Sequence, residues 1–312
     1  MTSWTEHVVV RDGVRISCRD WGDPGGPGGP GGTDGQGGPD GPDGPAPAVV
    51  LLHGLAGHAG EWDAVARELS PRHRVVAVDQ RGHGAAQRRP GDVSRSAYVA
   101  DTVAVCERLG LRQPVLVGQS LGGHTAMLAA AAHPGLFGAL VLVEAGPGGP
   151  SPDVPAEIGG WLDSWPTPFP SRESAVAFLG GGPVGEGWAA GLEERDGGWW
   201  PRFERDVMVG SLAENARRAF WDEWSQVSCP ALAVLGQSGI IAPEEIGEML
   251  RLRPETVALS VPGTGHDVHL ERPDVLLDVL RGFLGDVRAV SAVRDFRPAA
   301  GSPGAGRFPA AR

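Results

Sequence analysis

The feature that most constrains this chain is a serine on a glycine-flanked turn between an apolar run and an alanine-rich stretch. Ser120 is the middle residue of GQSLG at 118–122, directly after the apolar run 115–117 and before the stretch 125–132. A strand, a tight turn and a helix in this order form the setting in which a serine becomes an accessible nucleophile. The pattern therefore predicts a buried strand that ends at a reactive serine.

The glycines beside the serine explain the spacing of the motif. A serine hydroxyl reacts at neutral pH only where a base can take its proton and a substrate can approach it. A sharp turn meets both needs if the positions two before and two after the serine lack side chains, and Gly118 and Gly122 leave that room. The helix that follows points free amides toward the serine, so the Leu121 N–H is predicted to stabilise an oxyanion.

Two further segments lie where a serine nucleophile needs them. The apolar run 48–52 is typical of a strand buried on both faces and ends in HGLAG, so the Leu55 N–H is predicted as a second oxyanion donor. Downstream, 256–261 is predicted to be a late strand, and His266 follows it on a glycine-rich loop. A histidine on such a loop can reach the serine and act as general base.

Four segments, in this order along the chain, resemble those of the α/β-hydrolase superfamily. They are LLHGLAGH (51–58), VDQRGHG (78–84), VGQSLGGH (117–124) and PGTGHDVHLERPD (262–274). The resemblance implies an α/β fold with a doubly wound, mostly parallel sheet of about eight strands and a helical cap inserted after the sixth. It does not identify the substrate, because this fold hosts many chemistries.

The acid of the predicted triad departs from the common family pattern. The resemblance expects an aspartate in the turn after the strand 231–235, but Gly239 stands there. In a second branch, exemplified by some haloalkane dehalogenases, the acid follows the sixth strand, and here the strand 139–143 is followed by Glu144. A carboxylate at the end of an apolar strand needs a partner, and His266 is the natural one. We therefore expect Glu144 to orient His266.

Three alternatives for the acid stay open at this point. Glu144 could instead only accept hydrogen bonds from backbone amides in the turn at the strand end. Glu244 or Glu245 could serve, although Pro243 followed by carboxylates is typical of a helix start. Finally, the triad could be incomplete.

The other histidines are expected to contribute structure rather than chemistry. Packing or backbone hydrogen bonding is predicted for His53, His83, His124 and His133, and the resemblance implies a loop-shaping role for Asp79. His58 and His269 are candidates for lining a pocket. The chain has neither an H-E-x-x-H motif nor a cysteine pair, so no metal and no cofactor is expected.

Charge and composition limit the classes of binding partner that we expect. The net charge of -11 is spread along the chain, which disfavours nucleic acid and anionic membranes and leaves a small-molecule substrate. The chain contains no lysine, so Schiff-base chemistry through a lysine is excluded. Three distant cysteines are typical of reduced core thiols. Without a leader-like start or a run of about 20 apolar residues, a soluble, cytoplasmic enzyme is predicted; the oligomeric state is left open.

The expected organisation is one core interrupted by a cap. Residues 1–146 and 227–286 form the predicted hydrolase core, and 147–226 form the helical cap. The segment 23–47, almost entirely Gly, Pro and Asp, is predicted to be a flexible insert, and 287–312 a disordered tail.

Seven of the ten tryptophans lie in the predicted cap: Trp161, Trp165, Trp188, Trp199, Trp200, Trp221 and Trp224. Most are expected to form the core of the lid itself. If one or more face the cleft, they favour a hydrophobic or aromatic substrate, and the glycines at 180–182 and 197–198 would let the lid move.

The predicted function is that of a serine hydrolase. It would cleave an ester-like bond (carboxylic ester, thioester or lactone) or an activated C–C bond of a small, hydrophobic substrate through an acyl-enzyme on Ser120. Two alternatives are a cofactor-free perhydrolase of the haloperoxidase-like kind and a ligand-binding protein with a decayed triad. The second is motivated by Gly239 at the aspartate position.

Overall fold

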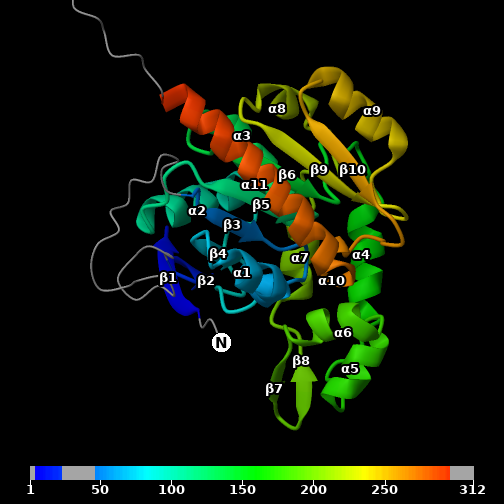
Figure 1. Ribbon diagram of the computed structural model, residues 1–312. Coiled ribbons are helices and arrows are strands. Elements are labelled where there is room, and N and C mark those ends of the chain that lie inside the picture. The colour runs from blue at the N-terminus through cyan, green and yellow to red at the C-terminus, as the bar shows by residue number, and fades with distance from the viewer. Residues whose placement is uncertain (1–3, 23–45, 296–312) are drawn as a thin grey trace, which may run out of the picture.

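A single eight-stranded sheet forms the centre of the molecule (Figure 1). The structure is a computed structural model that describes residues 4–22 and 46–295. The strand order is β1-β2-β4-β3-β5-β6-β9-β10; β2 runs antiparallel to both β1 and β4, and the other neighbouring strands in this sheet are parallel. The strands are β1 Thr5–Arg11, β2 Val14–Asp20, β3 Val49–Leu52, β4 Val75–Asp79, β5 Val115–Gln119, β6 Ala139–Val143, β9 Ala231–Gly236 and β10 Val257–Val261. The predicted fold class is confirmed.

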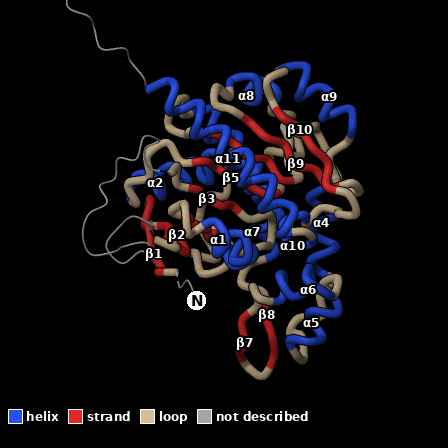
Figure 2. The backbone as a smooth tube through the Cα atoms, viewed as in Figure 1, coloured by secondary structure: helices blue, strands red, loops and turns tan. Residues whose placement is uncertain are grey.

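Helices cover both faces of this sheet, and a helical insertion follows β6 (Figures 1 and 2). The helices of the core are η1 Ala59–Trp62, α1 Asp63–Leu69, α2 Arg95–Arg108, α3 Leu121–Ala132, α9 Pro243–Leu252, α10 Val268–Glu271 and α11 Pro273–Asp295. The insertion contains α4 Val154–Asp163, α5 Arg172–Phe178, α6 Gly182–Ala189, the hairpin β7 Glu193–Arg195 and β8 Gly198–Trp200, α7 Arg205–Ser211 and α8 Trp221–Gln226.

The central strands are apolar on both faces because each face packs against helices. In β3, Val49 and Leu51 join a buried cluster with α1 and α11, whereas Val50 and Leu52 join a second cluster with α2 and α3. Strands buried on both sides show no polar alternation, which is why 48–52 is a continuous apolar run. The carboxyl ends of these strands therefore meet at one edge of a rigid sheet, where the site is built.

The cap forms its own apolar cluster against the turn after β3. Trp165, Phe169 and Met208 are buried in it, and Leu55 and Ala56 of that turn belong to the same cluster. Trp224, by contrast, is buried in a core cluster, and Trp221 packs against it. Figure 1 shows α8 beside α3 and α9, at a distance from α4 to α7.

Two predicted segments lie mainly outside the described residues. The insert at 23–47 is described only at 46–47. Of the predicted tail, 287–295 belong to α11, and 296–312 are outside the described residues.

Candidate active site

Ser120 stands on a strained turn at the carboxyl end of β5. Its backbone has φ 49° and ψ −118°, a conformation that L-residues rarely adopt. A Cβ added at Gly118 would overlap the backbone of Gly122 and Gly123, and one added at Gly122 would overlap the carbonyls of Leu52 and His53. Side chains are therefore excluded at both glycines, as the motif requires.

Two backbone amides beside the serine are free to donate. Among the described residues, neither the Leu55 N–H nor the Leu121 N–H has a hydrogen-bond acceptor in the protein. Leu121 is the first residue of α3, and Leu55 belongs to the turn whose Gly54 lies against Ser120, since a Cβ on Gly54 would be 3.4 Å from the Ser120 Cβ. Both amides thus flank the serine.

His266 lies on the loop between β10 and α10, and its side chain is 31% exposed. The buried Gln119 side chain donates a hydrogen bond from Nε2 to the His266 carbonyl at 3.1 Å. This contact ties the histidine loop to the elbow. The sequence indicates Gln119 only by its position directly before Ser120, and its contact with His266 depends on the tertiary fold.

Glu144 directly follows β6, and its carboxylate is buried at 1% exposure. Oε1 accepts a hydrogen bond from the Gly236 N–H at 2.6 Å, and Oε2 accepts one from the Ile240 N–H at 2.7 Å. Oε2 also lies 3.5 Å from Nδ1 of His266. Glu144 thus both bonds the turn backbone and faces the histidine.

Gly239 lies against the same carboxylate. A Cβ at this position would overlap Oε1, Cδ and Oε2 of Glu144. The aspartate expected at position 239 is absent, and the carboxylate of Glu144 occupies the space that its side chain would need.

The two alternative carboxylates have other surroundings. Glu245, on α9, accepts a hydrogen bond from the Gly148 N–H at 2.8 Å, and burial raises the pKa of its carboxyl. Glu244 is exposed on the first turn of the same helix. Neither forms a hydrogen bond or ion pair with His266 in the described part of the chain.

The predicted structural histidines have backbone or packing roles. The Nε2 of His53 accepts from the Gln80 N–H, and its Nδ1 donates to the Gly54 carbonyl, while burial lowers the His53 pKa to about 3. His83 donates to the Arg81 carbonyl, and burial likewise lowers its pKa to about 3.

On the elbow helix, His124 packs edge-on against Phe220, and His133 caps the exposed end of α3. Asp79 accepts hydrogen bonds from the amides of Ala59 and Ala85 and so joins two loops.

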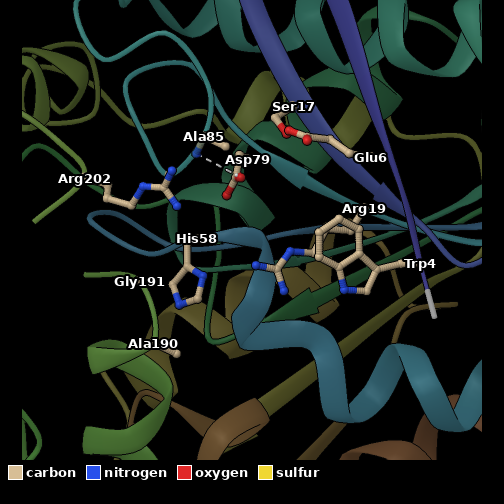
Figure 3. A pocket seen from close by; sticks show the side chains of 11 residues that line it. Trp4, Glu6, Ser17, Arg19, His58, Asp79, Ala85, Ala190, Gly191 and Arg202 are labelled. Carbon is tan, nitrogen blue, oxygen red and sulfur yellow. Dashed lines mark hydrogen bonds between the residues drawn. The ribbon is translucent and has the colours of Figure 1, made fainter. Parts of the chain in front are cut away.

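A cavity of about 190 Å³ opens between the β1–β2 hairpin, the loops after β3 and β4, and the cap (Figure 3). His58 lines it, whereas His269 is buried elsewhere. An adjoining smaller cavity lies between Trp165 and Trp188 of the cap and the Ala56–Gly57 turn. Two cap tryptophans therefore face a space next to the turn that carries the Leu55 amide.

The described residues hold no group of three or more His, Cys, Asp or Glu side chains suited to a metal ion. In the same part of the chain, every helix is too short or too polar to cross a membrane.

Residues 49–279 match the model of the alpha/beta hydrolase family, and the chain belongs to that family. It is 31% identical over 257 residues to the sn-1-specific diacylglycerol lipase ABHD11 of Mus musculus, an alignment that covers 76% of this chain and 81% of the relative. It is 30% identical over 254 residues to esterase Rv0045c of Mycobacterium tuberculosis, with 77% and 83% covered. The chain is therefore an esterase-like hydrolase of the α/β fold.

Solved structures share the fold as well. The crystal structure of E-2-(acetamidomethylene)succinate hydrolase aligns with a TM-score of 0.76 over 90% of this chain and 99% of that one, at 22% identity. At this level of identity the likeness concerns the fold alone.

Proposed function

We propose that the protein hydrolyses carboxylic esters of small, hydrophobic molecules through an acyl-enzyme on Ser120, with His266 as base and Glu144 as the acid. The observation that carries this proposal is the Glu144 carboxylate, which lies beside Nδ1 of His266 in the space that Gly239 leaves open. The alternative of a ligand-binding protein with a decayed triad rested on the missing aspartate. That motive disappears when Glu144 supplies the carboxylate.

Acylation follows from the arrangement of these groups. Oγ of Ser120 attacks the ester carbonyl carbon while Nε2 of His266 takes the hydroxyl proton. The carbonyl oxygen becomes an oxyanion that accepts hydrogen bonds from the Leu55 and Leu121 amides. The C–O bond to the alcohol then breaks, and His266 returns the proton to the leaving alkoxide. A water molecule repeats the sequence on the acyl-enzyme and releases the carboxylic acid.

Glu144 is suited to its part because two backbone amides hold its carboxylate in place. Oε1 accepts a hydrogen bond from the Gly236 N–H and Oε2 accepts one from the Ile240 N–H. The carboxylate holds a proton on Nδ1 of His266, leaves Nε2 free to accept the serine proton, and stabilises the imidazolium that forms.

The ester bond and the apolar substrate have separate supports. Two relatives at 30% identity or more are described as a diacylglycerol lipase and an esterase. Trp165 and Trp188 pack with Leu55 and Ala56 of the oxyanion turn in one apolar cluster, which favours an apolar acyl or alcohol group beside that turn. Thioesters, lactones, vinylogous diketones and peroxide-dependent turnover are the competing outcomes of a substrate panel.

The test is covalent labelling combined with pre-steady-state hydrolysis. A fluorophosphonate probe should label the wild-type protein at Ser120 and leave Ser120→Ala unlabelled, and p-nitrophenyl butyrate should give a burst of one p-nitrophenolate per active site. Folded wild-type protein that neither takes up the probe nor turns over any member of the panel would contradict the proposal and favour a binding role.

A further inference from the structure

A second carboxyl–histidine pair lies in the interior beside the site. Glu61 is on η1, shortly after the oxyanion turn, and His269 is on α10, three residues after His266. Oε2 of Glu61 lies 3.4 Å from Nε2 of His269, and the two side chains are 3% and 0% exposed. The pair therefore joins the two loops that carry the oxyanion amide and the histidine base.

Packing on both sides keeps this pair in place. The His269 ring lies 4.7 Å from the Trp62 ring, centre to centre. The Glu61 carboxylate fills the space beside Gly57, where a Cβ would come within 2.7 Å of Oε2. Gly57 in turn donates a hydrogen bond to the Gly54 carbonyl and closes the turn that contains Leu55. A displacement of Glu61 would therefore disturb Gly57 and, through the hydrogen bond from Gly57 to Gly54, the turn that carries the Leu55 amide.

Within the described residues, no arginine forms a hydrogen bond or ion pair with either side chain of the pair. The titratable groups that act on Glu61 from its surroundings are His58, Asp79 and Asp267. Those that act on His269 are Asp267, His266 and Glu271. Nearby, the Arg19 guanidinium is bound by Asp63.

Burial is the largest influence on the protonation of both groups. It raises the pKa of Glu61 to about 8 and lowers the pKa of His269 to about 4. Between these values both side chains are neutral, so the contact between Oε2 of Glu61 and Nε2 of His269 is a hydrogen bond between two uncharged groups, in which the tautomer decides which atom donates.

We propose that Glu61 and His269 form a positioning pair, a neutral hydrogen-bonded link that holds the oxyanion turn at a fixed distance from the catalytic histidine loop. The role rests on the proposed function of Ser120 and His266. The link costs desolvation that an apolar pair of the same shape would avoid, and it joins just the two loops whose separation determines catalytic geometry. Ionisation of Glu61 at alkaline pH would place a charge in this buried site, and the cost of that charge would loosen the packing that holds the turn.

The first test compares pH profiles of kcat and KM for p-nitrophenyl butyrate between pH 6 and 10. In the wild type, kcat should fall above about pH 8 with KM little changed. Glu61→Gln places an amide that can donate or accept a hydrogen bond and cannot ionise, so it should keep kcat near the wild-type value at pH 7 and lose the alkaline fall. Glu61→Met removes the hydrogen-bonding group, and a shift of the turn by about 1 Å should lower kcat about 100-fold at every pH. Glu68→Gln, on the exposed end of α1, is the matched control and should follow the wild type.

The second test does not depend on turnover. Hydrogen exchange, corrected for intrinsic rates, should rise together in peptides covering 53–62 and 264–271 between pH 7 and 9 in the wild type but not in Glu61→Gln. An alkaline fall that persists in Glu61→Gln, or Glu61→Met with wild-type kcat, would overturn the positioning role. Absent labelling of Ser120 alongside the expected exchange pattern would instead contradict the esterase mechanism and leave the link intact.

Discussion

The residues at positions 144 and 239 depend on each other. The carboxylate of Glu144 occupies the volume that a side chain at 239 would need, and it accepts hydrogen bonds from the amides of Gly236 and Ile240 in the same turn. In the proposed mechanism the acid is supplied from the end of β6, while the turn after β9 provides the amides that hold its carboxylate in place. A carboxylate from either strand would approach the same imidazole edge.

Replacing Glu144 by glutamine tests this assignment. The amide cannot hold the histidine tautomer or stabilise the imidazolium, so kcat should fall by about 10³ to 10⁴ with the fold intact. Steady-state kinetics and circular dichroism measure both effects. Glu245→Gln is the matched control, because Glu245 contacts the Gly148 amide instead of His266. Near-full activity of Glu144→Gln together with inactive Glu245→Gln would reverse the assignment.

At the scale of elements, two tryptophan-containing helices of the inserted segment pack in different parts of the molecule. Helix α8 belongs to the segment 147–226 that was predicted as cap, yet its Trp224 is buried in a core cluster and donates from Nε1 to the Met249 carbonyl at 3.0 Å. Trp161 of α4 is 38% exposed and stacks edge-on against Trp165 within the cap. Tryptophan content alone therefore does not separate cap from core.

Truncation of these two tryptophans should lower the free energy of unfolding by different amounts. Trp224→Ala empties a fully buried site and removes a hydrogen bond, so the free energy of unfolding should fall by about 3 to 5 kcal/mol. Trp161→Ala truncates a half-exposed side chain, so the free energy of unfolding should fall markedly less. Urea unfolding followed by circular dichroism measures both. Equal losses would mean that α8 is no more integral to the core than α4.

Periodicity and motifs predicted the elements, but not the contacts between them. Three features could be predicted from the sequence because each depends on neighbouring residues. They are the turn at Ser120, the strand after which the cap is inserted and the loop of His266. The link between Glu61 and His269 joins residues 208 positions apart, and neither stands in a pattern that signals a partner. The bond from Gln119 to the His266 carbonyl spans 147 positions. Such contacts arise from the packing of loops at one sheet edge, which a local pattern does not encode.

At the scale of the whole molecule, buried neutral histidines make the fold sensitive to acid. Burial lowers the pKa of His53 and His83 to about 3 and of His269 to about 4, and it lowers that of His124 well below 6.5. In the unfolded chain each binds a proton below about pH 6.5. The unfolded state therefore holds more protons between about pH 6.5 and 4, and stability is lost as the pH falls through that window.

His124 offers a clean measure of this effect. Neither of its ring nitrogens has a hydrogen-bond partner within the described residues, so His124→Leu removes the titration without breaking a bond. Each such histidine contributes about 1.4 kcal/mol per pH unit to the slope of unfolding free energy against pH. His124→Leu should lower the slope near pH 5 by that amount, as measured by urea unfolding at pH 4.5, 5.0 and 5.5. His133→Gln, at an exposed helix end, is the matched control and should leave the slope unchanged. An unchanged slope in His124→Leu would mean that His124 is protonated in the fold.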